Sequence, residues 1–168
     1  MECSRNSSFT DDVLDLYMSS FDEREKVPIE NIERTFGHGG ELITYHDDGG
    51  FVGFTFHFSQ DDRIFFVYFA TRPELRSKGY GSEMIRMFRE MFSDRRIFFP
   101  VEALDEKASD IEIRRRRHAF YLRNGCVRSG YTVISDDYPF DLFYMNGSVT
   151  KDEAVETIGL YESVHNGE

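Results

Sequence analysis

A glycine-containing turn at residues 76–82 has the residue types and the spacing to bind a phosphate-bearing ligand. Its sequence, Arg-Ser-Lys-Gly-Tyr-Gly-Ser, follows an apolar segment and leads into a helical pattern. Gly79 and Gly81 allow the backbone to turn tightly and to approach a ligand closely. The free N–H groups of the first helical turn, together with the helix dipole, form an anion site that suits phosphates. Arg76 and Lys78 add positive charge, and each charge-assisted hydrogen bond can contribute ~1.5–3 kcal/mol.

Two common nucleotide-binding motifs do not fit this turn. A Walker loop requires Gly-x-x-x-x-Gly-Lys-Ser/Thr, which the segment lacks. A dinucleotide fingerprint requires a third glycine and an acidic ribose partner about twenty residues later, and the sequence has neither at those positions. The turn alone is also compatible with an ordinary strand-to-helix connection that binds nothing.

The segments on either side predict the elements that position the turn. Residues 64–70 are apolar on both faces, which is typical of a central strand covered on both sides. Residues 96–101 form another strand, in which Pro100 cannot donate a ladder hydrogen bond. A helix is expected at about 109–123 because Asn124-Gly125 can cap its end. The helix that begins at the turn has apolar residues at helical spacing along one side: Tyr80, Met84, Met87, Phe88, Met91 and Phe92.

The rest of the chain completes the predicted fold. Helices are expected at 11–21, with Val13, Leu14, Tyr17 and Phe21 on one face, at 28–36 and from residue 150 onward. Strands are expected at 41–46 and 51–58 and in a closing hairpin of residues 126–134 and 138–145. Residues 1–10 are polar and are expected to be loose. In the second strand, one face should carry the side chains of Val52, Phe54, Phe56 and Phe58.

This element order predicts an α/β (α+β) fold. The sheet should be mixed and mostly antiparallel, with about six to seven twisted strands and helices on both faces. At ~150 residues per domain, the 168 residues form a single domain.

Composition and charge exclude several classes of protein. The chain has 31 acidic and 20 basic residues and a formal net charge of −11, which argues against a general nucleic-acid binder. The charge favours encounters with cations such as amines, although solubility alone is an alternative explanation. The longest apolar run is far too short for a membrane span. With only two cysteines and no apolar run of signal-peptide length near the start, the sequence predicts a cytoplasmic protein.

Two segments, in order, resemble the GNAT N-acetyltransferase superfamily. Residues 69–82, Phe-Ala-Thr-Arg-Pro-Glu-Leu-Arg-Ser-Lys-Gly-Tyr-Gly-Ser, are similar to its acetyl-CoA-binding motif. Residues 118–126, His-Ala-Phe-Tyr-Leu-Arg-Asn-Gly-Cys, are similar to a later helix of the family, with Cys126 in place of the usual Phe. The resemblance covers roughly residues 40–135 and implies one GNAT-like domain over residues 1–168.

The resemblance also implies roles for individual residues. The backbone of Phe69 and Thr71 should hydrogen-bond the pantetheine arm of acetyl-CoA, at a point where the next strand turns away. Tyr121 matches the tyrosine that protonates the leaving thiolate, although without the family it would be interpreted as a core tyrosine. Arg114 replaces an asparagine that is frequent in the family. The cofactor-binding set is therefore predicted to be Phe69, Ala70, Thr71, Arg76, Ser77, Lys78, Gly79, Tyr80, Gly81 and Ser82.

The general base is less well defined, because residues 64–70 contain no carboxylate. Glu102, at the end of the following strand, is the first candidate, with Asp105 second and His57 third. The alternative for Glu102 is a surface carboxylate without a catalytic role, and the alternative for His57 is a sheet-face histidine without one. A water chain to bulk solvent is a further alternative to any of these bases. The acidic residues of the segment 23–25 border the acceptor region in the family, and with Glu41, Asp47 and Asp48 they could recruit a cationic amine.

These observations predict an N-acetyltransferase that transfers an acetyl group from acetyl-CoA to a primary amine by direct transfer in a ternary complex. The amine can belong to a small molecule or to a protein, and a homodimer is compatible with the family. No metal, nucleic acid or membrane partner is expected. The alternatives are a non-catalytic module that binds or senses acyl-CoA and a nucleotide-phosphate protein.

Overall fold

The computed structural model describes all 168 residues. Its strands are β1 (Glu2–Asn6), β2 (Gly40–Asp47), β3 (Gly50–Gln60), β4 (Arg63–Thr71), β5 (Arg96–Glu102), β6 (Val127–Ser135) and β7 (Tyr138–Met145). Its helices are α1 (Asp11–Ser20), α2 (Ile29–Glu33), α3 (Tyr80–Met91), α4 (Ile111–Arg123) and α5 (Lys151–Asn166), with a short 3-10 helix η1 (Pro73–Leu75).

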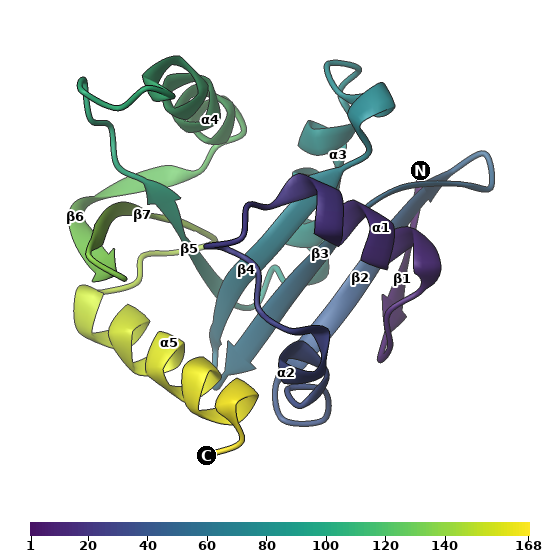
Figure 1. The fold of residues 1–168 in the computed structure, drawn as a ribbon, viewed down its shortest axis with the longest axis horizontal. Helices are drawn as coiled ribbons and strands as arrows, with labels where there is room; N and C mark the ends of the chain where they lie inside the picture. The colour runs from purple at the N-terminus through teal and green to yellow at the C-terminus, as the bar shows by residue number, and fades with distance from the viewer.

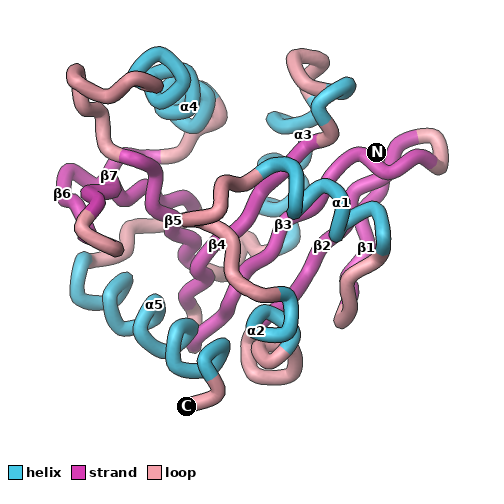
Figure 2. Tube along the Cα trace, viewed as in Figure 1, coloured by secondary structure: helices cyan, strands magenta, loops and turns pink.

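The seven strands form one sheet in the order β1-β2-β3-β4-β5-β7-β6. Only the β4–β5 pair is parallel, and all other neighbours are antiparallel. Helices α1, α2 and α5 pack on one face, and α3 and α4 pack on the other (Figure 1, Figure 2). The predicted fold class is therefore confirmed, with β7 inserted between β5 and β6.

The sheet opens between β4 and β5, and this separation positions the site described below. The two strands are paired only where residues 63–65 face residues 96–98. Next to this short ladder, the pairing of β3 with β4 shifts between Phe56 and His57 and leaves Val67 as an extra residue in β4. A bulge of this kind bends a strand and increases its twist, so β4 turns away from β5. Pro100 lies beyond the paired region, where its missing N–H costs no hydrogen bond to β4.

Three sequence predictions about the first half of the chain are wrong. Residues 1–10 are not wholly loose, because β1 pairs with β2 along its whole length. Its exposed side chains carry no strand pattern, and the strand is held by main-chain hydrogen bonds at the edge of the sheet. Val52 does not share a face with Phe54, because the β2–β3 register shifts beside it and Val52 packs among residues under α3. In α1, Leu16 is buried where Leu14 was expected.

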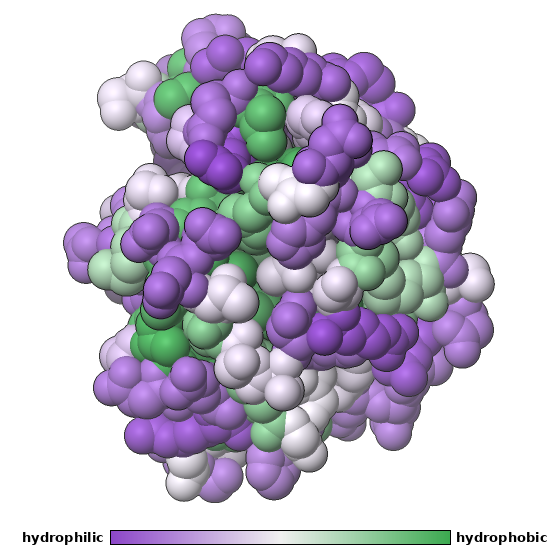
Figure 3. Space-filling view, turned by 90° about the vertical axis from the view of Figure 1, so that its right-hand side faces the viewer, coloured by the Kyte–Doolittle hydropathy of each residue, from purple (hydrophilic) through white to green (hydrophobic).

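Polar residues cover much of the visible surface (Figure 3). The face of the molecule on the β1 side is largely hydrophilic, with smaller hydrophobic areas between the polar residues (Figure 3). None of the five helices combines the length and the apolar character that a membrane crossing requires. Both cysteines are free thiols.

The aromatic packing beneath α3 should contribute strongly to stability. Phe88 is fully buried and lies within 5.2 Å, between ring centroids, of His57, Phe66 and Phe92. We predict that Phe88→Ala lowers the free energy of unfolding by about 3–5 kcal/mol, because it removes apolar contacts and leaves a cavity. Urea denaturation measures this change. Met18→Ala, at a 56% exposed position, is the control, and an equal loss in both variants would contradict the packing described here.

Candidate active site

A cleft of about 810 Å³ lies where β4 and β5 separate, on the face of the sheet covered by α3 and α4. Both helices lie at the same end of the sheet, on either side of this separation (Figure 1). The cleft brings together the β4 edge, the glycine turn and one side of α4. Its lining includes Phe69, Ala70, Thr71, Arg76, Ser77, Gly79, Gly81, Ser82, Arg117, Phe120, Tyr121 and Arg123.

The β4 edge presents unpaired main-chain groups to the cleft. The Arg72 N–H donates to Val52 O across the β3 side of the strand. Hydrogen-bonding direction alternates along a strand, so Phe69 and Thr71 direct their N–H and C=O groups to the opposite side. On that side β5 no longer pairs with β4. Arg76 Nε donates to Thr71 O from that side, at 3.3 Å. A ligand in the cleft can therefore hydrogen-bond this edge as an additional strand would.

The glycine turn supplies a second set of free donors. None of the N–H groups of residues 77–82 donates to a main-chain oxygen of the protein. Ser77 and Gly79 adopt left-handed backbone conformations, with φ of 62° and 88°, which turn the chain sharply into α3. Successive free amides at a helix start attract an anion, and Arg76 adds its charge beside them. The geometry suits a diphosphate.

Eight of the ten residues predicted to bind the cofactor line the cleft. Lys78 and Tyr80 do not: Lys78 is exposed, and the Tyr80 hydroxyl donates to Asp47 Oδ2 at 2.6 Å. Gly81 is needed for close packing, since a Cβ there would lie 3.3 Å from Cζ of Phe120. Phe120 also stacks on Phe69, so α4 closes over the beginning of α3.

Tyr121 is 9% exposed and lies in the cleft with its ring packed against Phe99 of β5, at 4.6 Å between centroids. Burial raises the pKa of Tyr121, and the nearby Arg117 charge opposes that shift only in part. The phenol therefore stays protonated throughout the neutral range and is available as a proton donor.

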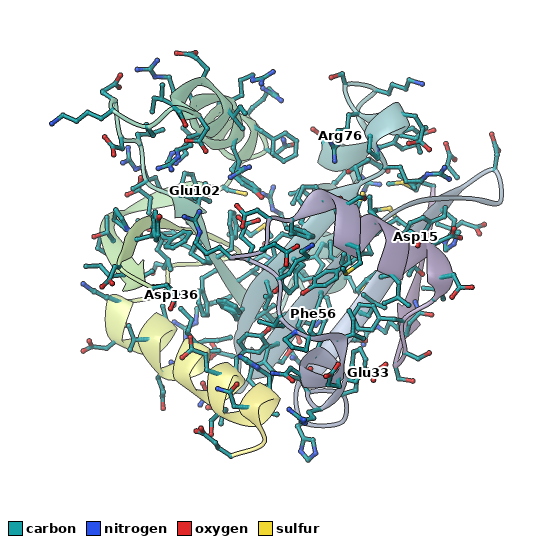
Figure 4. The ribbon with its side chains drawn as sticks, in the orientation of Figure 1. Asp15, Glu33, Phe56, Arg76, Glu102 and Asp136 are labelled. Atoms are coloured by element: carbon teal, nitrogen blue, oxygen red, sulfur yellow. The ribbon has the colours of Figure 1, made fainter.

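The three predicted base candidates do not line the cleft. Glu102, at the end of β5 below α4 (Figure 4), has its side chain only 11% exposed. It is paired with the guanidinium groups of Arg117, Arg114 and Arg24, at 3.0, 3.1 and 3.6 Å. The Arg114 guanidinium also donates to Asp110 Oδ1 and to Ala103 O.

The other two candidates lie elsewhere in the fold. Asp105 is exposed and accepts a hydrogen bond from the Lys107 N–H. His57 is fully buried on the α3 face, where its Nε2 lies 3.3 Å from Glu41 Oε2. Burial lowers the pKa of His57, which Glu41 only partly offsets.

The carboxylate that does line the cleft is Glu25, from the segment between α1 and α2. Tyr68 of β4 holds this segment in place by donating from its hydroxyl to the Glu25 main-chain oxygen at 2.7 Å. Burial raises the pKa of Glu25, Asp22 and Glu102 raise it further, and Arg117 opposes them. The sequence indicated only that this segment could attract a cation. It could not show that the chain returns to the point where β4 and β5 separate.

No cluster of three or more His, Cys, Asp or Glu side chains is arranged to hold a metal ion. The residues of the site can supply hydrogen bonds, charge stabilisation and, at Tyr121 and Glu25, groups that exchange a proton.

Comparison with known proteins identifies the class of protein to which this fold and cleft belong. Residues 10–126 match the model of the acetyltransferase (GNAT) family. The chain belongs to this family, which confirms the resemblance found in its two motifs. None of the curated proteins matches the chain.

Solved structures share the fold. A GNAT-family protein from Bacteroides thetaiotaomicron is 24% identical, with 92% of this chain and 88% of that chain covered and a TM-score of 0.71. An aminoglycoside 6′-N-acetyltransferase complexed with coenzyme A is 15% identical, with 90% and 100% covered and a TM-score of 0.68. An acetyltransferase from Bacillus subtilis in complex with CoA is 11% identical, with 87% and 98% covered and a TM-score of 0.58.

Arg76 provides a test of the anion site. We predict that Arg76→Glu weakens binding of coenzyme A by about ten-fold or more, because it replaces a charge-assisted donor by a repelling carboxylate. Isothermal titration calorimetry measures the affinity. Arg72→Glu is the matched control, since Arg72 is exposed in the same loop, pairs with Glu74 and does not line the cleft. Equal affinity in both variants would contradict the assignment.

Proposed function

We propose that residues 1–168 act as one N-acetyltransferase domain that transfers the acetyl group of acetyl-CoA to a primary amine by direct transfer in a ternary complex. The observation that carries this proposal is the continuity of the cleft. One cavity is lined by the unpaired edge of β4, by four residues of the turn with free amides, Ser77, Gly79, Gly81 and Ser82, and by Tyr121. These groups match, in order, the amides, the diphosphate and the thiol of the cofactor.

In this reaction, the nitrogen lone pair of the amine attacks the thioester carbonyl, the C–N bond forms and the C–S bond breaks. Tyr121 donates its proton to the departing thiolate, and the developing charge on the acyl oxygen requires a main-chain N–H donor. The unpaired edge of β4 borders the cleft and can supply such a donor. Family membership supports acyl transfer, and the acetyl group and the amine acceptor are the finer parts of the proposal.

We propose that Glu25 is the base that accepts the proton of the amine. An ammonium group has no lone pair, so a base must remove a proton before or during the attack. Glu25 lines the cleft and has no ion-pair partner, whereas Glu102 lies outside the cleft among three arginines. Its raised pKa also makes the Glu25 carboxylate a better proton acceptor than an ordinary glutamate. Glu102 stays the competing assignment from the sequence, and both are tested below.

A thiol-release assay with acetyl-CoA and a broad panel of primary amines tests the function. We expect turnover with at least one amine, and we expect Tyr121→Phe to lower kcat by about 100-fold or more with little change in the affinity for acetyl-CoA. Binding of acetyl-CoA without turnover across the panel, together with no effect of Tyr121→Phe, would instead support a non-catalytic acyl-CoA-binding module. Preference for ATP or NAD over coenzyme A in a thermal-shift screen would contradict both readings.

The pH profile tests the base. Protonated Glu25 cannot accept a proton, so kcat/KM should fall as the pH drops through the pKa of Glu25, which burial places above the ordinary carboxyl value. The charged groups that act on this carboxylate are Asp22 of its own segment, Arg117 of α4 and Glu102 of β5, and Tyr68 of β4 contacts the Glu25 main chain.

We predict that Glu25→Gln lowers kcat/KM by about 100-fold and removes this acidic limb of the profile. Glu102→Gln should keep the limb but move it to lower pH, because Glu102 does not line the cleft and its charge raises the pKa of Glu25. If Glu102→Gln removes the limb and Glu25→Gln keeps it, the assignment to Glu25 is wrong and the prediction from the sequence is right. Thermal melting of both variants controls for loss of fold.

A further inference from the structure

A second cavity, of about 750 Å³, lies on the opposite face of the sheet, beneath α5 and the β6–β7 hairpin. It shares four lining residues with the cleft: Phe21, Glu25, Val67 and Pro100. These residues belong to the α1–α2 segment, the β4 bulge and β5, so the two cavities meet where the strands separate. A molecule in the second cavity can therefore reach the proposed reaction point from the side opposite the cofactor.

The two cavities differ in the chemistry of their walls. Twelve of the 21 residues that line the second cavity are hydrophobic, against eight of 19 in the cleft. The apolar wall is contributed by several elements of the fold and is largely aromatic on the sheet side. Its members include Phe65 and Tyr68 of β4, Phe140 of β7, and Val155, Ile158 and Tyr161 of α5.

The charges also differ. Arg76, Arg117 and Arg123 line only the cleft, whereas Asp136 and Glu162 line only the second cavity, and Glu25 lines both. Asp136 lies at the β6–β7 turn, above the beginning of α5 (Figure 4).

Two basic residues also line the second cavity, but neither presents a free positive charge. Arg24 stacks over the Tyr138 ring at 3.9 Å and pairs with Glu102. Burial lowers the pKa of His165, so its ring is neutral at pH 7. The cleft therefore suits the anionic cofactor, and the second cavity suits a cation with an apolar body.

Gly159 indicates that this space is kept open. It lies inside α5, where a glycine destabilises a helix by about 1 kcal/mol relative to alanine. A Cβ at Gly159 would meet no atom within 4 Å, and the backbone is not in the left-handed region. Neither packing nor backbone conformation therefore requires glycine at this position. Its place in the wall of the second cavity supplies a reason, because a side chain there would occupy the cavity.

We propose that the second cavity is the acceptor site and that it selects a primary amine with an apolar body of about aromatic size, an arylalkylamine or alkylamine, with its ammonium group toward Glu25. This inference rests on the proposed function for the reaction, but not for the binding. An aminoglycoside, whose surface is polar and carries several charges, would leave the aromatic wall unmatched.

Calorimetric titration of amines into the protein saturated with coenzyme A tests the site without requiring turnover. We expect 2-phenylethylamine to bind about ten-fold or more tightly than ethanolamine or kanamycin, because only its ring is removed from water in the cavity. Gly159→Phe should weaken binding of 2-phenylethylamine by about ten-fold or more. Gly159→Ala, the matched control, should change it by no more than about two-fold, and neither variant should melt at a lower temperature.

Tighter binding of ethanolamine or kanamycin, no binding of any amine, or unchanged binding in Gly159→Phe would each overturn the proposal. The proposed function fails in a different way. If 2-phenylethylamine binds and Gly159→Phe blocks its binding, but acetyl-CoA releases no thiol with any amine, the amine site is supported and the proposed acetyl transfer is contradicted. If amines are acetylated without preference for apolar bodies, the proposed acetyl transfer is supported and the proposed selectivity is contradicted.

Discussion

The site depends on main-chain hydrogen-bonding groups that the sheet leaves unpaired. β4 is central and buried, and its parallel partner β5 follows it for only three residue pairs. Unpaired N–H and C=O groups inside a protein are costly, so an edge of this kind is stable only where water or a ligand satisfies it. The bulge at Val67 turns β4 away, and the neighbouring pairing of β5 with β7 holds β5 in its own position. A ligand that supplies amide groups in the cleft can replace the missing strand.

The two cavities that meet at this separation differ in the charge of their lining residues. On the α3 and α4 face, free amides and arginines make the cleft attractive to an anion, and on the α5 face carboxylates and aromatic rings line the second cavity. Glu25 lies where the two environments meet, and its raised pKa follows from burial at that junction. This arrangement suits the proposed direct transfer, because the acyl donor and the amine can approach each other from opposite sides of the sheet.

Much of the fold and of the lining of the candidate site could be predicted from the sequence, because both depend on local patterns. The apolar run of β4, the glycine turn and the helical spacing of α3 are contiguous in the chain, and the structure places them as expected. β1 could not be predicted, since it is held by main-chain pairing and carries a polar sequence. The position of Glu25 was also beyond the sequence, because it depends on how a connecting segment packs against Tyr68, far along the chain.

A crystal structure of the protein with coenzyme A tests the central claim most directly. The account predicts that the pantetheine amides hydrogen-bond the main chain of Phe69 and Thr71, and that the diphosphate accepts from the amides of residues 77–82. The thiol should then lie beside Tyr121, at the junction with the second cavity. A cofactor bound elsewhere on the molecule, or a β5 strand that pairs with β4 along its whole length, would contradict the account.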